Sequence, residues 1–102
     1  MGFSGGSYEE VARWLHNFLT SHAKREHPRL EAVLEAGGER EGHSYSAWLR
    51  FGERRSGPME FDFEDVAGHR GSLAWCKALA EQTRALAREV MAQAPRFDAR
   101  AR

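Results

Sequence analysis

Apolar residues near the start of the chain recur at steps of three and four, which is the spacing of one face of an α-helix. Ser7 followed three residues later by Glu10 is a capping-box signature, and it places the start of this helix after Ser7. The pattern therefore predicts an amphipathic helix over residues 8–25. Its apolar stripe consists of Val11, Trp14, Leu15, Phe18, Leu19 and His22.

A shorter apolar face follows at Leu30, Val33 and Leu34. Pro28 precedes it, and proline is favoured at the first position of a helix. Glycines begin at Gly37 and stop the pattern. We expect a second short helix between Pro28 and Gly37, or a kinked continuation of the first helix.

From residue 43 to residue 51 the period changes to two, which predicts a β-strand. The stretch GERRSGP reads as a turn, and PMEFDFED, residues 58–65, reads as the returning strand of a hairpin. A register centred on Arg55 pairs Phe51 with Met59, Leu49 with Phe61 and Ala47 with Phe63. The opposite face then pairs Arg50 with Glu60, Trp48 with Asp62 and Ser46 with Glu64.

A long final helix is predicted after VAGHRGS and ends before Pro95. Its buried side consists of Leu73, Cys76, Leu79, Ala80, Thr83, Leu86, Ala87 and Val90. The order of elements is α(α)ββα, which is an α+β fold with an antiparallel hairpin packed on helices. We expect one domain over residues 7–94, a flexible leader over residues 1–6 and a flexible basic tail over residues 95–102.

A two-stranded hairpin is marginally stable alone, and both of its edges are open in this reading. A homodimer is the simplest way to complete such a sheet, because a second copy can pair with an open edge or pack its long helix against the first copy. We therefore expect the chain to dimerise.

Composition excludes several classes of protein. A hydrophobic content of 41% in 102 residues is too high for a disordered chain. Fifteen basic residues balance fifteen acidic ones, so no net charge favours a polyanion or an anionic membrane. No signal-peptide pattern and no apolar run long enough for a membrane span is visible. We expect a soluble cytoplasmic protein that needs no cofactor.

The acidic row Glu60, Asp62 and Glu64 is the first candidate site, together with Trp48 and Arg50 on the same predicted face. Carboxylates two apart on a strand could bridge a cation, but no second acidic segment is evident to complete the ligand set. A partner-binding or subunit-facing surface is the better interpretation, because Trp and Arg are favoured anchors at interfaces.

A second candidate is an anion site at GHRGS, where glycines, Arg70 and Ser72 lead into the final helix. The stretch lacks the phosphate-binding loop pattern, and serine caps of this kind are common. The five histidines form no metal-binding pattern, and Cys76, the single cysteine, reads as a small buried residue.

The leading hypothesis is a homodimeric protein-interaction or regulatory module without catalytic activity. One alternative is a nucleic-acid or phosphate-ligand binder that uses local basic patches, and another is a small-molecule binder with a dimer groove. The patches are Lys24, Arg25, Arg54, Arg55 and Arg70, and the groove would be lined by Tyr45, Trp48 and Trp75.

The double-stranded RNA-binding domain also has helices flanking strands and a basic turn. That fold needs a third strand and a lysine-rich start to its last helix. The sequence predicts no third strand and offers only Lys77 in that helix. On these grounds we do not assign the chain to that family.

Overall fold

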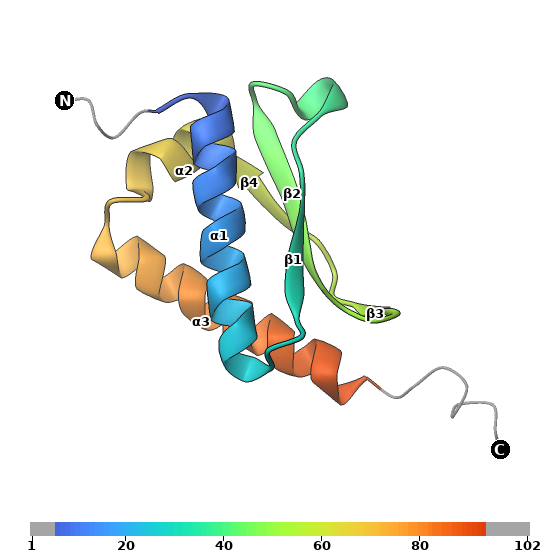
Figure 1. The fold of residues 1–102 in the computed structure, drawn as a ribbon. Coiled ribbons are helices and arrows are strands. Elements are labelled where there is room, and N and C mark those ends of the chain that lie inside the picture. The colour runs from blue at the N-terminus through green and yellow to red at the C-terminus, as the bar shows by residue number, and fades with distance from the viewer. Residues whose placement is uncertain (1–5, 94–102) are drawn as a thin grey trace, which may run out of the picture.

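The computed structural model describes residues 6–93 and has an α+β fold with one antiparallel sheet (Figure 1). The predicted leader up to residue 5 and the predicted tail lie outside the described residues. The helices are α1 (Tyr8–Glu26), α2 (Phe63–His69) and α3 (Leu73–Ala92), with a 3₁₀ turn, η2 (Gly38–Arg40). The strands are β1 (Glu31–Glu35), β2 (Ser44–Phe51), β3 (Arg54–Arg55) and β4 (Met59–Asp62).

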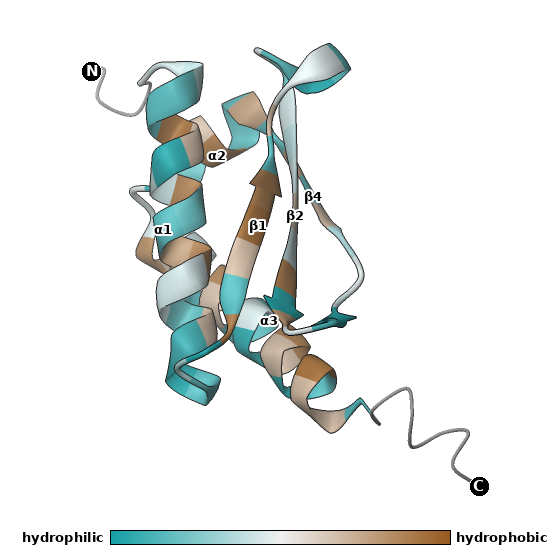
Figure 2. Ribbon diagram, turned by 45° about the vertical axis from the view of Figure 1, so that its right-hand side comes forward, coloured by the Kyte–Doolittle hydropathy of each residue, from teal (hydrophilic) through white to brown (hydrophobic). Residues whose placement is uncertain are grey.

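The first and last helices confirm the two helices predicted from hydrophobic spacing, but Leu73, which was predicted on the buried side of the last helix, is 88% exposed at its first position. The Ser7 side chain accepts from the Glu10 backbone N–H, and the Glu10 carboxylate accepts from the Ser7 N–H, so both bonds of the capping box form. Figure 2 shows hydrophobic bands alternating with polar bands along α1, as expected for a helix with one buried face. Ser72 caps α3 in the same way, by accepting from the Trp75 N–H.

The second predicted helix is wrong, because residues 31–35 form strand β1. His27 at the end of α1 is extended, and β1 pairs antiparallel with β2 over its whole length. Leu30 and Ala32 are buried, whereas Glu31 is exposed, so the side chains alternate as in a strand. Pairing with β2 outweighs the local helical preference of this Leu-, Glu- and Ala-rich stretch.

The hairpin exists, but its predicted register is wrong. The turn lies at Gly52, whose φ of +61° suits glycine, so Phe51 pairs with Arg54 instead of Met59. After a bulge at residues 56–58 the chain pairs with β2 again, and Ala47 lies opposite Met59. The apolar residues still face the same side, because the displacement along β2 is an even number of residues.

The returning strand also ends earlier than predicted. Asp62 accepts from the Asp65 backbone N–H and caps α2, so Phe63, Glu64 and Asp65 are helical. The sheet consequently has β2 at its centre, β1 on one side and the interrupted strand β3–β4 on the other. The third strand that the sequence reading lacked is therefore β1.

Within residues 6–93, helices cover one face of the sheet and leave the other face open (Figure 1). On the covered face Tyr45, Ala47 and Leu49 are fully buried. Helix α1 packs against β1 and α3, and α3 packs against β2 and β3. The core is completed by Val11, Leu15, Leu19, Ala23, Leu30, Ala32, Met59, Val66, Ala67, Leu79, Ala87 and Val90.

Candidate functional site

Four of the five predicted interface residues lie on the open face of the sheet. Trp48 and Arg50 project from β2, and Glu60 and Asp62 project from β4. Glu64 does not join them, because it lies in the first turn of α2, where it is exposed. We call the outward side chains of β1, β2, β3 and β4 the open face; they are Glu31, Val33, Glu35, Ser44, Ser46, Trp48, Arg50, Arg55, Glu60 and Asp62.

Trp48 is the centre of the open face. It lies opposite Val33 of β1, and both side chains are half-buried. The Arg55 guanidinium lies 4.3 Å from the centre of the Trp48 ring, which is the geometry of a cation–π contact. The indole is therefore flanked by an apolar residue on one side and stacked under a cation.

The end of the open face next to the Gly52 turn is basic. Arg50 and Arg55 are cross-strand partners, and Arg50 also forms an ion pair with Glu31 at 3.3 Å. The predicted pairing of Arg50 with Glu60 is wrong, because the true register places Ser46 opposite Glu60. Both members of the Arg50–Glu31 pair are about half exposed, so solvent screens their attraction.

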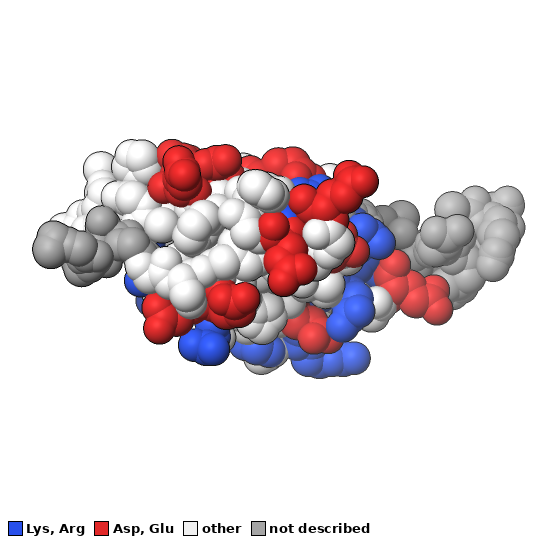
Figure 3. All heavy atoms as spheres, turned by 90° about the horizontal axis from the view of Figure 1, so that it is seen from above, with Lys and Arg blue, Asp and Glu red and all other residues white. Residues whose placement is uncertain are grey.

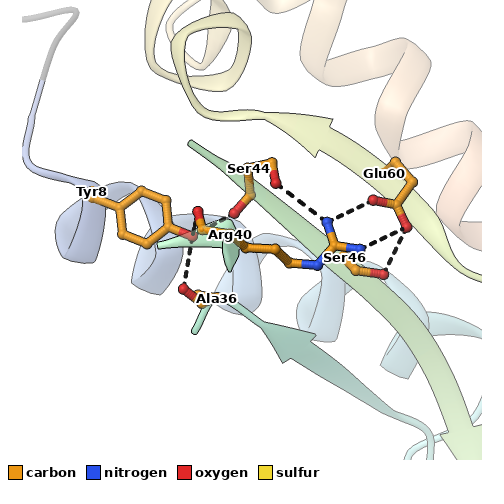
Figure 4. Close-up of polar contacts among 6 residues, drawn as sticks. All are labelled: Tyr8, Ala36, Arg40, Ser44, Ser46 and Glu60. Carbon is orange, nitrogen blue, oxygen red and sulfur yellow. Dashed lines mark hydrogen bonds and ion pairs between the residues drawn. The ribbon is translucent and has the colours of Figure 1, made fainter. Parts of the chain in front are cut away.

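The opposite end of the open face contains a polar network around Glu60 (Figure 4). Arg40 Nη1 and Nη2 donate to the two Glu60 carboxylate oxygens at 2.8 and 3.3 Å, and Nη1 also lies 3.3 Å from Ser44 Oγ. The buried Ser46 hydroxyl donates to Glu60 at 3.0 Å. The bonds from Arg40 and Ser46 to the charged carboxylate lower the pKa of Glu60 below its usual value.

Arg40 is held in place by the loop between β1 and β2, and Tyr8 holds that loop (Figure 4). Tyr8 Oη lies within hydrogen-bonding distance of three backbone carbonyl oxygens, those of Ala36, Arg40 and Ser44. A neutral phenol has one proton, so it donates to one of them at a time. Sequence reasoning missed both Tyr8 and Arg40, because one precedes the hydrophobic stripe and the other lies in a loop.

Charges are segregated along the direction of the strands. The end that contains the β1–β2 loop, the start of α1 and helix α2 is mainly acidic, and Figure 3 views the molecule from this end. Its acidic side chains are Glu9, Glu10, Glu35, Glu39, Glu41, Glu60, Asp62, Glu64 and Asp65. The end with the Gly52 turn and the last turns of α1 and α3 is mainly basic: it carries Lys24, Arg25, Arg29, Arg50, Arg54, Arg55, Arg84 and Arg88, against Glu26, Glu31, Glu53 and Glu89.

Arg70 and Ser72, the residues of the predicted anion site, lie in other local environments than the sequence suggested. The Ser72 hydroxyl already accepts the Trp75 N–H as the cap of α3. Arg70 lies at the end of α2, and its guanidinium lies beside Gly6, where a Cβ would approach Nη2 to 2.7 Å. Arg70 therefore lies at the acidic end of the fold, away from the other arginines of the predicted patches.

Three aromatic residues expected to line a groove lie in different parts of the fold. Tyr45 is fully buried in the core, where it stacks on Tyr8. Trp48 is on the open face, and Trp75 is on α3, 6.4 Å from the Trp14 ring. One copy of the described chain does not bring the three side chains together.

Other reactive groups offer little chemistry. Burial raises the pKa of the Cys76 thiol, which disfavours the nucleophilic thiolate at neutral pH. Within residues 6–93 no group of three His, Cys, Asp or Glu side chains is arranged to hold a metal ion. None of the helices in this described part of the chain is long and apolar enough to cross a membrane.

The chain was compared with models of protein families, with curated proteins and with solved structures. None of the three comparisons finds a match to this chain.

Proposed function

We propose that this chain is a homodimeric protein-interaction module without catalytic activity, and that two copies associate through the open face. The observation that carries the proposal is the position of Trp48. A tryptophan at the centre of an uncovered sheet face, stacked under Arg55 and next to Val33, has the composition of an interface anchor. The single cysteine, Cys76, fits a cytoplasmic location for such a module.

The edges of the sheet are less suited to association than its face. Strand β4 has four residues between Pro58, which lacks an N–H, and helix α2, so its free edge is short. An antiparallel pair of β1 strands centred on Val33 would place Glu31 directly opposite Glu35 of the second copy. Like charges directly opposite on neighbouring strands are destabilising.

The size of the open face sets the expected strength of association. Three strands and eight residues of β2 give a face roughly 14 Å wide and about 25 Å long. A contact of roughly 350 Å² per copy is smaller than most specific interfaces, so we expect a weak, transient dimer with a dissociation constant in the high micromolar range.

Sedimentation equilibrium from about 5 to 500 μM tests the proposal. The wild-type chain should approach the mass of a dimer as concentration rises, and Trp48→Ala should weaken association about tenfold or more. Leu73→Ala is a matched control, because Leu73 is an 88% exposed apolar residue of α3 that lies away from the open face. A monomeric mass across the whole range would refute the proposal.

The second candidate function is nucleic-acid or phosphate binding at the basic end. Lys24 and Arg25 lie in the last turn of α1 and Arg54 and Arg55 lie in the hairpin, all at the basic end of the fold, which supports this alternative. The third strand β1 also removes one of the two differences from the double-stranded RNA-binding domain. Filter binding of a short duplex RNA at low salt tests it, because phosphate contacts are strongest there. No retention at tens of micromolar protein would eliminate this candidate.

A further inference from the structure

The open face has opposite charges at its two ends, and this polarity limits how two copies can pack. At the end of the open face near Gly52, the formal charges of Arg50, Arg55 and Glu31 add up to about +1. At the other end the four charged side chains Glu35, Glu60, Asp62 and Arg40 give about −2. The net charge of the whole chain is zero, so composition alone does not reveal that the two ends of the open face have opposite charges.

We infer that the partner of the open face is a second copy of this chain whose strands run in the opposite sense, so that the basic end of each face covers the acidic end of the other. The inference rests on the proposed homodimer and specifies its arrangement. A two-fold axis between the two sheets, perpendicular to the strands and passing by Trp48, generates this arrangement. Every contact in such a dimer occurs twice.

The strand register gives the contacts that this axis predicts. On the strand formed by β3 and β4, Arg55 lies opposite Arg50, which is two residues after Trp48. Glu60 lies opposite Ser46, which is two residues before Trp48. Rotation about the axis therefore places Arg55 over Glu60 of the second copy, and the two Trp48 side chains meet at the centre. Aligned sheets pack about 10 Å apart, which long arginine and glutamate side chains can span.

The alternative two-fold axis, parallel to the strands, is disfavoured by the same charges. It would place Arg50 over Arg50 and Glu60 over Glu35 of the second copy, and its one favourable contact would be Arg55 over Glu31, which already pairs with Arg50. Like charges across an interface cost several kcal/mol and suppress the wrong arrangement. The opposed arrangement also brings Glu31 over Glu35 of the second copy, twice in the dimer, and there each Glu31 is paired with its own Arg50.

Charge reversal with mixing tests the arrangement by sedimentation equilibrium. Arg55→Glu and Glu60→Lys should each weaken the homodimer at least tenfold, because each change creates two repulsive contacts. A one-to-one mixture of the two variants should recover a dissociation constant within about threefold of wild type. In the mixed dimer one contact joins the two substituted side chains, which attract, and the other retains Arg55 and Glu60.

Controls separate this inference from the proposed function. Lys77→Glu and Glu81→Lys make the same charge changes at exposed positions of α3 and should leave association unchanged. Circular dichroism checks that each variant is folded. If Glu60→Lys unfolds, the double variant Arg40→Glu with Glu60→Lys replaces it, because the double variant keeps an ion pair between positions 40 and 60. A wild-type monomer overturns the proposed function. A wild-type dimer whose charge variants behave like the controls, or whose mixture does not recover, overturns the opposed arrangement alone.

Discussion

Ser56 gives the most direct test of the bulge that sets the hairpin register. It is buried, and its hydroxyl accepts the Leu49 backbone N–H at 3.0 Å and donates to the Gly57 carbonyl at 2.8 Å. Its own N–H donates to the Leu49 carbonyl at 2.9 Å. The hydroxyl thus replaces the backbone carbonyl that would accept from Leu49 in a regular ladder.

Ser56→Ala removes the acceptor and leaves the Leu49 N–H buried without a partner. A buried donor left unsatisfied costs about 1–3 kcal/mol, and the net loss of an ordinary hydrogen bond is about 1 kcal/mol. We therefore expect the free energy of unfolding to fall by about 2 kcal/mol. For a domain of this size that corresponds to a lower melting temperature by roughly 8–16 °C.

Urea unfolding followed by circular dichroism at one fixed protein concentration measures this change, since dimerisation makes stability depend on concentration. Ser21→Ala on the exposed surface of α1 is the matched control and should change stability by less than about 0.5 kcal/mol. A loss at Ser56 no larger than that of the control would show that the hydroxyl does not replace a ladder acceptor.

Two further predictions concern the loop end of the sheet. Tyr8→Phe removes the hydroxyl proton that can be donated to the carbonyl oxygens of residues 36, 40 and 44. It should lower the free energy of unfolding by about 1–2 kcal/mol, as measured by urea unfolding, and an unchanged stability would contradict this. Because the folded pKa of Glu60 is depressed, its ion pair stabilises the fold above the unfolded pKa near 4.5, and this contribution is lost as pH falls through the lower folded pKa. Glu60→Gln should flatten this acid limb of the stability–pH curve, and a limb as steep as in wild type would show that Glu60 is not its source.

The elements that sequence reasoning predicted correctly are those whose stability comes from their own pattern. Helix α1 has a long apolar stripe and a complete capping box, and α3 has a serine cap and twenty residues of helical period. The division of faces in the hairpin was also predictable, because Met59 and Phe61 alternate with acidic residues. Side-chain periodicity and local capping residues are enough to predict these features.

The features that sequence reasoning missed depend on partners distant along the chain. Residues 31–35 are good helix formers, and only pairing with β2 makes them a strand. The hairpin register depends on one extra residue at the bulge, which has no hydrophobic signature. Arg40 lies in a loop whose carbonyl groups surround the Tyr8 hydroxyl, and its contact with Glu60 joins residues 20 positions apart, so spacing did not predict the network at the acidic end of the open face.

The order of the strands has a consequence for how the chain folds. Strand β2 pairs with β1, which precedes it, and with β3 and β4, which follow it, so each of these ladders joins segments that are close in the sequence. The contact between α1 and α3, by contrast, joins the two ends of the described chain. Local contacts form early and distant ones late, so we expect the meander to appear first and the packing of α1 on α3 to complete folding. The face of the sheet that α3 covers would then remain exposed and aggregation-prone until α3 has left the ribosome.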